Sequence, residues 1–150
     1  MDPLRVALIQ SRSPATPQAA LAHLRPLLAD AVAGGARLIL TPEASNFMEK
    51  RADRKALILE DQAEDLVVQG LCQVAADAGI WVLIGSAMVR SDDPADPRAA
   101  NRSILINDRG EIVSAYDKLH VFDVDLPKGE HYRESTGVRP GESAVVAPTP

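Results

Sequence analysis

The N-terminal part of the sequence carries the pattern that most constrains the fold. An apolar run over residues 5–10 is followed by leucine and alanine at helical spacing over residues 17–33, by Gly34 and Gly35, and by a second apolar run over residues 37–40. Short apolar runs that end at turn residues are typical of strands buried on both faces of a sheet. Paired glycines are typical of a helix end. The pattern therefore predicts a strand, a helix and a second strand parallel to the first, joined by a right-handed crossover.

A second unit of the same kind follows. Residues 61–78 have apolar side chains at helical spacing and acidic residues in the first turn, which favours a helix. Gly79 ends this helix, and residues 80–85 form a third buried strand. Residues 44–60 mix apolar and charged side chains without a clean period, so we expect a loop there with room for one helical turn.

The pattern changes in the last third of the sequence. Residues 102–106 and 111–116 are strand-like and are joined by residues 107–110, a turn that ends in glycine, so we expect an antiparallel hairpin. A last strand is expected over residues 143–147. The predicted fold class is α/β, with an open mixed sheet of about six strands and two main helices on one face.

Two helices can cover only one face of such a sheet. The other face needs a cover that these residues do not contain. Two arrangements would supply it: the molecule dimerises through its sheet, or residues 1–150 are the first half of a longer domain.

The charge of the chain limits its partners. Its 21 acidic and 16 basic residues give a net charge of −5, whereas nucleic acids and anionic membranes select for basic surfaces. We therefore expect no nucleic acid and no membrane as a partner. The first apolar run is too short for a signal peptide core or a membrane span, which favours a cytoplasmic protein. The single cysteine, Cys72, leaves no disulfide framework and no paired-cysteine metal site.

Two residues of opposite charge stand where an α/β sheet presents side chains to a cleft. Glu43 and Lys118 each lie just beyond the end of an apolar run. Either residue alone has a simpler interpretation, because Glu43 suits the first turn of a following helix and Lys118 suits a solvated surface. Because both residues lie at the ends of predicted strands, we favour a functional site that contains both.

The other reactive side chains are poor candidates for catalysis. Cys72 lies in the middle of the second predicted helix, about 150° from the centre of its apolar stripe, with no basic neighbour to lower its pKa. We therefore interpret Cys72 as structural or incidental. We expect His23 to face solvent, and His120 and His131 to make local hydrogen bonds, because no Gly-x-Ser-x-Gly turn offers a serine partner. Phosphate-loop, dinucleotide-binding and His-Glu-x-x-His motifs are also absent from the sequence.

Several short motifs occur together in one order along the chain. They are Arg5-Val6-Ala7-Leu8-Ile9-Gln10, Leu40-Thr41-Pro42-Glu43, Asn101-Arg102-Ser103, Tyr116-Asp117-Lys118-Leu119-His120-Val121-Phe122-Asp123, Tyr132-Arg133-Glu134-Ser135 and Arg139-Pro140-Gly141-Glu142. With these motifs the chain resembles the nitrilase superfamily of carbon-nitrogen hydrolases from about residue 4 to residue 148. Residues 132–142 are similar to its Nit branch, the ω-amidases and deaminated glutathione amidases.

The resemblance implies a nitrilase-like αββα sandwich, of which this chain supplies about one half. Residues 1–150 would then be the N-terminal part of a single carbon-nitrogen hydrolase domain, and the second half of the domain would supply the missing cover. Members use a cysteine nucleophile, a glutamate base, a lysine and a second glutamate. Glu43, Lys118 and Glu134 match the last three, and the role of Glu43 requires partial burial to raise its pKa. The resemblance places the nucleophile beyond residue 150.

The leading functional hypothesis follows from this resemblance. It is hydrolysis of the carbon-nitrogen bond of a small ω-amide of a carboxylic or keto acid through a cysteine thioester, without a metal or an organic cofactor. We expect residues 1–150 alone to be inactive and the protein to be a homodimer or a higher homo-oligomer. Two alternatives remain within the family, a nitrilase and an N-carbamoyl amidohydrolase. An alternative of another class is a non-catalytic α/β module that binds a small ligand or a partner through its uncovered sheet face.

Overall fold

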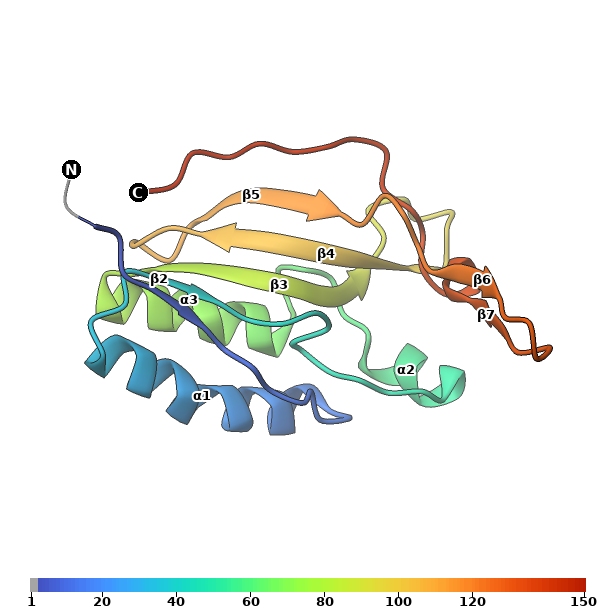
Figure 1. Cartoon of the computed structure of the whole chain (residues 1–150), viewed down its shortest axis with the longest axis horizontal. Helices are drawn as coiled ribbons and strands as arrows, with labels where there is room; N and C mark the ends of the chain where they lie inside the picture. The colour runs from blue at the N-terminus through green and yellow to red at the C-terminus, as the bar shows by residue number, and fades with distance from the viewer. Residues whose placement is uncertain (1–2) are drawn as a thin grey trace.

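The computed structural model describes residues 3–150, and its centre is one mixed sheet (Figure 1). Its five strands lie in chain order, with β1, β2 and β3 parallel and β3, β4 and β5 antiparallel. The α/β class with a mixed sheet is therefore confirmed. The strands are β1 (Val6–Leu8), β2 (Leu38–Leu40), β3 (Trp81–Arg90), β4 (Ala99–Ile106) and β5 (Ile112–Asp117).

Two long helices cover one face of the sheet, as predicted. α1 (Pro17–Ala33) and α3 (Leu66–Ala78) lie side by side beneath it in Figure 1. α3 begins five residues later than the apolar pattern predicts, because Asp65 caps it by accepting hydrogen bonds from the first backbone N–H groups of the helix. The main core fills the space between the helices and the sheet, and its largest buried side chains are Leu24, Leu28, Ile39, Val67, Leu71, Val82, Ile84, Ile104 and Ile106.

The segment predicted as a loop with room for one helical turn contains a short helix of seven residues, α2 (Ala52–Ile58). None of its residues is buried, so it has no apolar face that would give the sequence a helical period. α2 stands apart from α1 and α3, near the end of the sheet where β3 stops and β4 begins (Figure 1). α2 therefore lies beside that end of the sheet and contributes no buried residue to the core.

A second, smaller hairpin was not predicted from the sequence. β6 (Asp123–Asp125) pairs with β7 (His131–Arg133), and a single 3-10 turn (Glu134–Thr136) follows. The next residues return to the main sheet, where the backbone of Ala99 exchanges hydrogen bonds with Gly137 and Arg139. The hairpin and the segment that follows it therefore place residue 134 close to the end of β5.

The second face of the sheet is largely open, and two predictions about it were wrong. β1 is not buried on both faces, because Val6 and Leu8 are 44% and 76% exposed. Residues 143–147 do not form a strand; this segment runs back along β5 without pairing with it (Figure 1). The apolar side chains on this face therefore lack a sheet or helix to pack against within residues 3–150. No helix within residues 3–150 is long and apolar enough to span a membrane.

Candidate active site

The three residues singled out from the sequence meet at one end of the sheet. The ammonium Nζ of Lys118 lies 2.9 Å from Glu134 Oε2 and 3.3 Å from Glu43 Oε1. Glu43 follows β2, Lys118 follows β5, and Glu134 opens the turn after β7. The fold thus brings Lys118 within hydrogen-bond distance of a carboxylate that lies 75 positions earlier in the sequence.

The turn that holds Glu43 is fixed to β3 by short contacts. Ala44 adopts a positive φ of 50°, which is uncommon for a residue with a Cβ, and its N–H donates to the buried Ser86 hydroxyl at 2.8 Å. On the other side of the turn, a Cβ at Gly85 would lie 2.2 Å from the Thr41 carbonyl oxygen. Only glycine therefore allows the turn to approach β3 so closely.

Asn101 links the two carboxylates. Its buried side-chain amide donates to Glu43 Oε1 at 2.8 Å and to Glu134 Oε1 at 3.4 Å. Its backbone carbonyl accepts a hydrogen bond from the Lys118 N–H at 2.9 Å. In the sequence Asn101 is visible only as part of the Asn101-Arg102-Ser103 motif, and its place in the site was not predicted. The signal that could have identified Asn101 is the pairing of β4 with β5, which places Asn101 beside Lys118.

The contacts keep Lys118 and Glu134 ionised. Partial desolvation lowers the pKa of Lys118, but hydrogen bonds to Glu134 and Glu43 outweigh it and raise that pKa above the ordinary value. Desolvation likewise raises the pKa of Glu134, but the Phe122 N–H and the Lys118 ammonium outweigh it and lower that pKa. The Glu43 side chain is 61% exposed, so the partial burial that its expected role requires is not supplied within residues 3–150.

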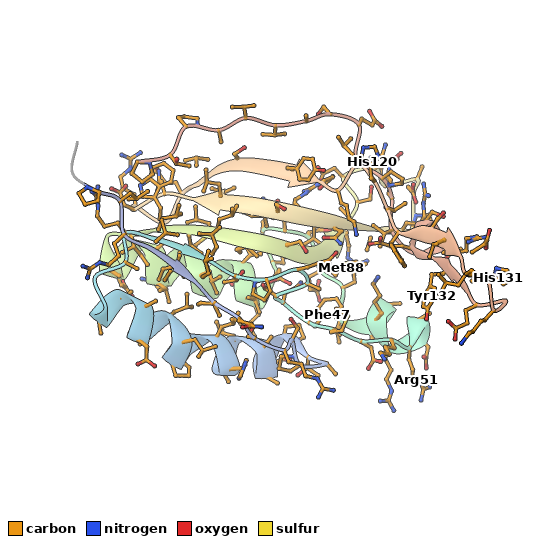
Figure 2. All side chains as sticks on the ribbon, in the orientation of Figure 1. Phe47, Arg51, Met88, His120, His131 and Tyr132 are labelled. Atoms are coloured by element: carbon orange, nitrogen blue, oxygen red, sulfur yellow. The ribbon has the colours of Figure 1, made fainter. Side chains whose placement is uncertain are left out.

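These groups line a cavity of about 580 Å³, a size that suits a small-molecule ligand. Figure 2 shows Phe47, Met88 and Tyr132 gathered between the end of the sheet, α2 and the β6–β7 hairpin. The other lining residues include Lys55 and Glu49 from the α2 region and Arg133 from β7. Among the described residues, no cysteine, serine or threonine lines this cavity.

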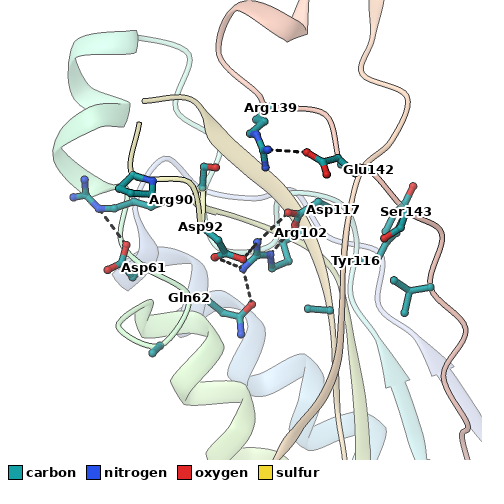
Figure 3. Close-up of a pocket in the computed structure, with 16 residues that line it drawn as sticks. Asp61, Gln62, Arg90, Asp92, Arg102, Tyr116, Asp117, Arg139, Glu142 and Ser143 are labelled. Atoms are coloured by element: carbon teal, nitrogen blue, oxygen red, sulfur yellow. Dashed lines mark hydrogen bonds and ion pairs between the residues drawn. The ribbon is translucent and has the colours of Figure 1, made fainter. Parts of the chain in front are cut away.

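A larger cavity of about 1050 Å³ lies on the other side of β4 and β5 (Figure 3). Its central Arg102 is held by both oxygens of Asp117, at 2.6 and 2.9 Å, and by both oxygens of Asp92, at 3.0 and 2.8 Å. Arg139 pairs with Glu142 in the same wall. Because these charges bind one another, we assign the candidate active site to the smaller cavity despite its size.

The remaining candidates lie outside the site. Cys72 borders a separate cavity in contact with Gly110, and burial raises the pKa of its thiol, which disfavours the reactive thiolate. His131 lies 2.6 Å from Asp125 on the small hairpin. His23 and His120 are exposed. Among residues 3–150, no group of three or more potential ligands is placed to hold a metal ion.

Comparison with known proteins agrees with the motifs. The carbon-nitrogen hydrolase family model matches residues 5–150. The deaminated glutathione amidase of Yersinia enterocolitica is 34% identical over 118 residues, which cover 77% of this chain and 40% of that protein. The chain therefore spans less than half the length of this relative.

Solved structures show the same fold. The NitFhit protein of C. elegans superposes with a TM-score of 0.80 at 20% identity, covering 93% of this chain and 34% of that one. A mutant of the amidase from Nesterenkonia sp. AN1, in complex with butyramide, superposes with a TM-score of 0.71 at 26% identity, covering 93% of this chain and 49% of that one. The sheet and its helices thus form part of a nitrilase-like fold.

Proposed function

The chain belongs to the carbon-nitrogen hydrolase family, and from this premise we propose that it provides three catalytic groups of an amidase that hydrolyses a small ω-amide of a carboxylic or keto acid. One observation carries the proposal: the Lys118 ammonium lies between the carboxylates of Glu43 and Glu134 in the wall of a cavity of small-molecule size. The amidases among the family's members support amide hydrolysis as the reaction class.

The chemistry assigns a distinct role to each group. A cysteine thiol loses its proton to Glu43 and its sulfur attacks the amide carbon, which forms a tetrahedral oxyanion. Glu43 then returns the proton to the leaving nitrogen, so ammonia departs and a thioester remains. Water then gives a proton to Glu43 while its oxygen attacks the thioester carbon. Glu43 returns this proton to the leaving sulfur, so the acid is released and the thiol is restored. Lys118 stabilises the oxyanion, and Glu134 orients Lys118.

We propose that the nucleophile lies outside these 150 residues. The only cysteine, Cys72, borders a different cavity and has a raised pKa. No cysteine, serine or threonine among the described residues lines the Lys118 cavity. Residues 1–150 alone should therefore release no ammonia from an amide.

We also propose that residues 1–150 are the N-terminal part of one domain. The open sheet face supports this arrangement, because the exposed Val6 and Leu8 offer an apolar surface to a second sheet. A cover that extended to the exposed Glu43 would also supply the partial burial that a general base near neutral pH requires.

Two substitutions in the complete domain test the proposal. Glu43→Gln and Lys118→Ala should each lower the rate of ammonia release about 10²- to 10⁴-fold, because each removes a group that acts in the transition state. Glu64→Gln and Lys128→Ala change exposed residues outside the cavity and serve as matched controls. Unchanged amide hydrolysis in both Glu43→Gln and Lys118→Ala would show the assignment to be wrong.

The same assay separates the two alternatives within the family. Carboxylic amides, nitriles and N-carbamoyl amino acids are offered to the complete domain at equal concentration. We expect turnover of the amides to exceed that of the other two classes. A clear preference for nitriles or carbamoyl compounds would replace the amidase by the corresponding alternative.

A further inference from the structure

One charged group in the wall of the Lys118 cavity has no side-chain partner in the described part of the chain. Lys55, on α2, is half-buried and lines the cavity. Within residues 3–150, its ammonium group makes no hydrogen bond or ion pair with any side chain. The other two cations of the wall do: Lys118 binds Glu43 and Glu134, and Arg133 binds Asp125. The remaining acid of the wall, Glu49, accepts the backbone N–H of Arg51.

An unpaired ammonium at such a place is unfavourable in the empty cavity. Burial lowers the pKa of Lys55, and only the nearby charge of Glu134 opposes this effect. A partly desolvated cation that faces a cavity gains most from an anion that enters it. Lys55 is thus suited to an anionic group of a ligand rather than to a contact within the chain.

The charge balance of the cavity supports the same conclusion. Its described lining has three acidic residues, Glu43, Glu49 and Glu134, and three basic residues, Lys55, Lys118 and Arg133, so without Lys55 it would carry a net charge of −1, which would repel an anionic substrate. The guanidinium of Arg133 is engaged by Asp125 and by the carbonyl groups of Val124 and Tyr132. Lys55 is therefore the cation that remains able to attract a negative charge into the cavity among the described lining residues.

Lys55 comes from another part of the fold than the reacting groups. Lys118, Glu43 and Glu134 follow strands or the small hairpin, whereas Lys55 belongs to α2 and lines the same cavity, close enough to Glu134 for the two charges to interact. Apolar side chains including Phe47, Met88 and Val138 line the space as well. A ligand that carries an amide, a short alkyl chain and an anionic group would match the kinds of side chain in this wall.

Building on the proposed amidase function, we infer that Lys55 binds the carboxylate of the substrate and makes the cavity selective for amides that carry one. Lys55 is a specificity residue, and it takes no part in bond making or breaking. Its contribution therefore appears in substrate binding rather than in the rate of the bound complex.

A pair of substrates and a set of variants of the complete domain test the inference. The substrates are the monoamide of glutaric acid and valeramide, which has a similar chain length and no carboxylate. Lys55→Met removes the charge and keeps the length, Lys55→Arg keeps the charge, and Lys50→Met alters an exposed neighbour that does not line the cavity. We expect Lys55→Met to raise the KM for the glutaric monoamide about 10- to 100-fold, the range of a charge-assisted hydrogen bond.

The other arms separate a carboxylate contact from a general loss of structure. Lys55→Met should change kcat/KM for valeramide less than about threefold. Lys55→Arg should restore most of the affinity for the glutaric monoamide, and Lys50→Met should resemble the unsubstituted protein. Equal losses with both substrates, or no loss with either, would overturn the inference while leaving the amidase proposal intact.

Binding of glutarate, measured by calorimetry, tests Lys55 independently of turnover. Weaker glutarate binding in Lys55→Met, by about tenfold or more, supports the carboxylate contact even if no amide is hydrolysed. Glutarate binding that is the same in Lys55→Met and Lys50→Met contradicts it. Failure of the complete domain to hydrolyse either amide would count against the proposed function.

Discussion

Two charged clusters lie back to back on β4 and β5. Asn101 and Lys118 face the smaller cavity, and their chain neighbours Arg102 and Asp117 face the larger one, because successive strand residues point to opposite sides. The Arg102 side chain is 8% exposed and is bound by two carboxylates through both oxygens of each. Lys118 is 30% exposed and leaves the Glu43 carboxylate largely open.

The difference shows how a structural cluster and a reactive one can be told apart. Near Arg102, fork-shaped donors match planar acceptors, so the charges satisfy one another and hold strands and loops together. Near Lys118, a single ammonium is shared by two carboxylates, which also accept hydrogen bonds from the Asn101 amide, and oxygen atoms remain accessible from the cavity. Unsatisfied bonding capacity, rather than cavity size or the number of charges, identifies the candidate active site.

The largest difference between the clusters should be seen in stability. Arg102→Met leaves Asp117 without its partner in a half-buried place, so we expect a loss of about 2–4 kcal/mol in the free energy of unfolding, below the full cost of a buried pair because Asp92 is solvated. Urea unfolding of the complete domain measures it. Lys118→Met should cost about 1 kcal/mol or less, since its partners stay partly hydrated. A larger loss for Lys118→Met than for Arg102→Met would reverse the comparison.

A smaller effect is expected at Asn101. Asn101→Ala removes the donor shared by Glu43 and Glu134, so we expect kcat to fall about tenfold. Loss of this donor also raises the pKa of Glu134, so the acid limb of the pH–rate profile should shift to higher pH.

Asn107→Ala is the matched control for Asn101→Ala. Asn107 is also buried, but it stabilises the β4–β5 turn away from the cavity. We expect Asn107→Ala to lower stability and to leave kcat and the pH profile unchanged. A similar fall in kcat for both variants would reduce Asn101 to a structural role.

The smallest expected effect is a difference between the two clusters in how the free energy of unfolding depends on pH. The pKa of Lys118 is raised above its ordinary value of 10.5, so its stabilisation is complete below that pH and is lost as the pH rises through the folded-state pKa. Arginine stays protonated there, so the Arg102 cluster loses nothing. Above pH 10.5 the stability of the unsubstituted domain should therefore fall more than that of Lys118→Met, by less than about 1 kcal/mol. Parallel curves for the two proteins would show that Lys118 gains nothing from its carboxylates.

On the acid side both clusters should lose stability. The pKa of Asp92 and the pKa of Glu134 are both lowered, so both contributions are present above the ordinary carboxylate pKa and disappear as the pH falls through the folded-state values. Only the alkaline side can therefore separate them.

Much of the fold was predictable because it depends on local periodicity. α1, α3 and the β4–β5 hairpin have clear apolar spacing and turn residues. The sequence allowed only one helical turn where α2 has seven residues, because none of them is buried, and the β6–β7 hairpin was missed because each of its strands has only three residues. The exposure of β1 was not visible in the sequence, because an apolar strand has the same pattern whether or not its cover is present.

The candidate site was predictable only in part. Glu43, Lys118 and Glu134 were found through motifs at strand ends, and the structure brings them together. Asn101 and Lys55 were not predicted. The significance of Asn101 depends on contacts between distant segments, and that of Lys55 depends on the lack of a side-chain partner in the cavity wall. Such information exists only in the folded chain.

Acid-quenched mass spectrometry of the complete domain during turnover of the glutaric monoamide tests the central claim most directly. We expect one acyl adduct on a cysteine outside residues 1–150, an unmodified Cys72, and no adduct in Lys118→Met. An acyl group on Cys72, or the same adduct level in Lys118→Met, would contradict the assignment of the Lys118 cavity as the active site.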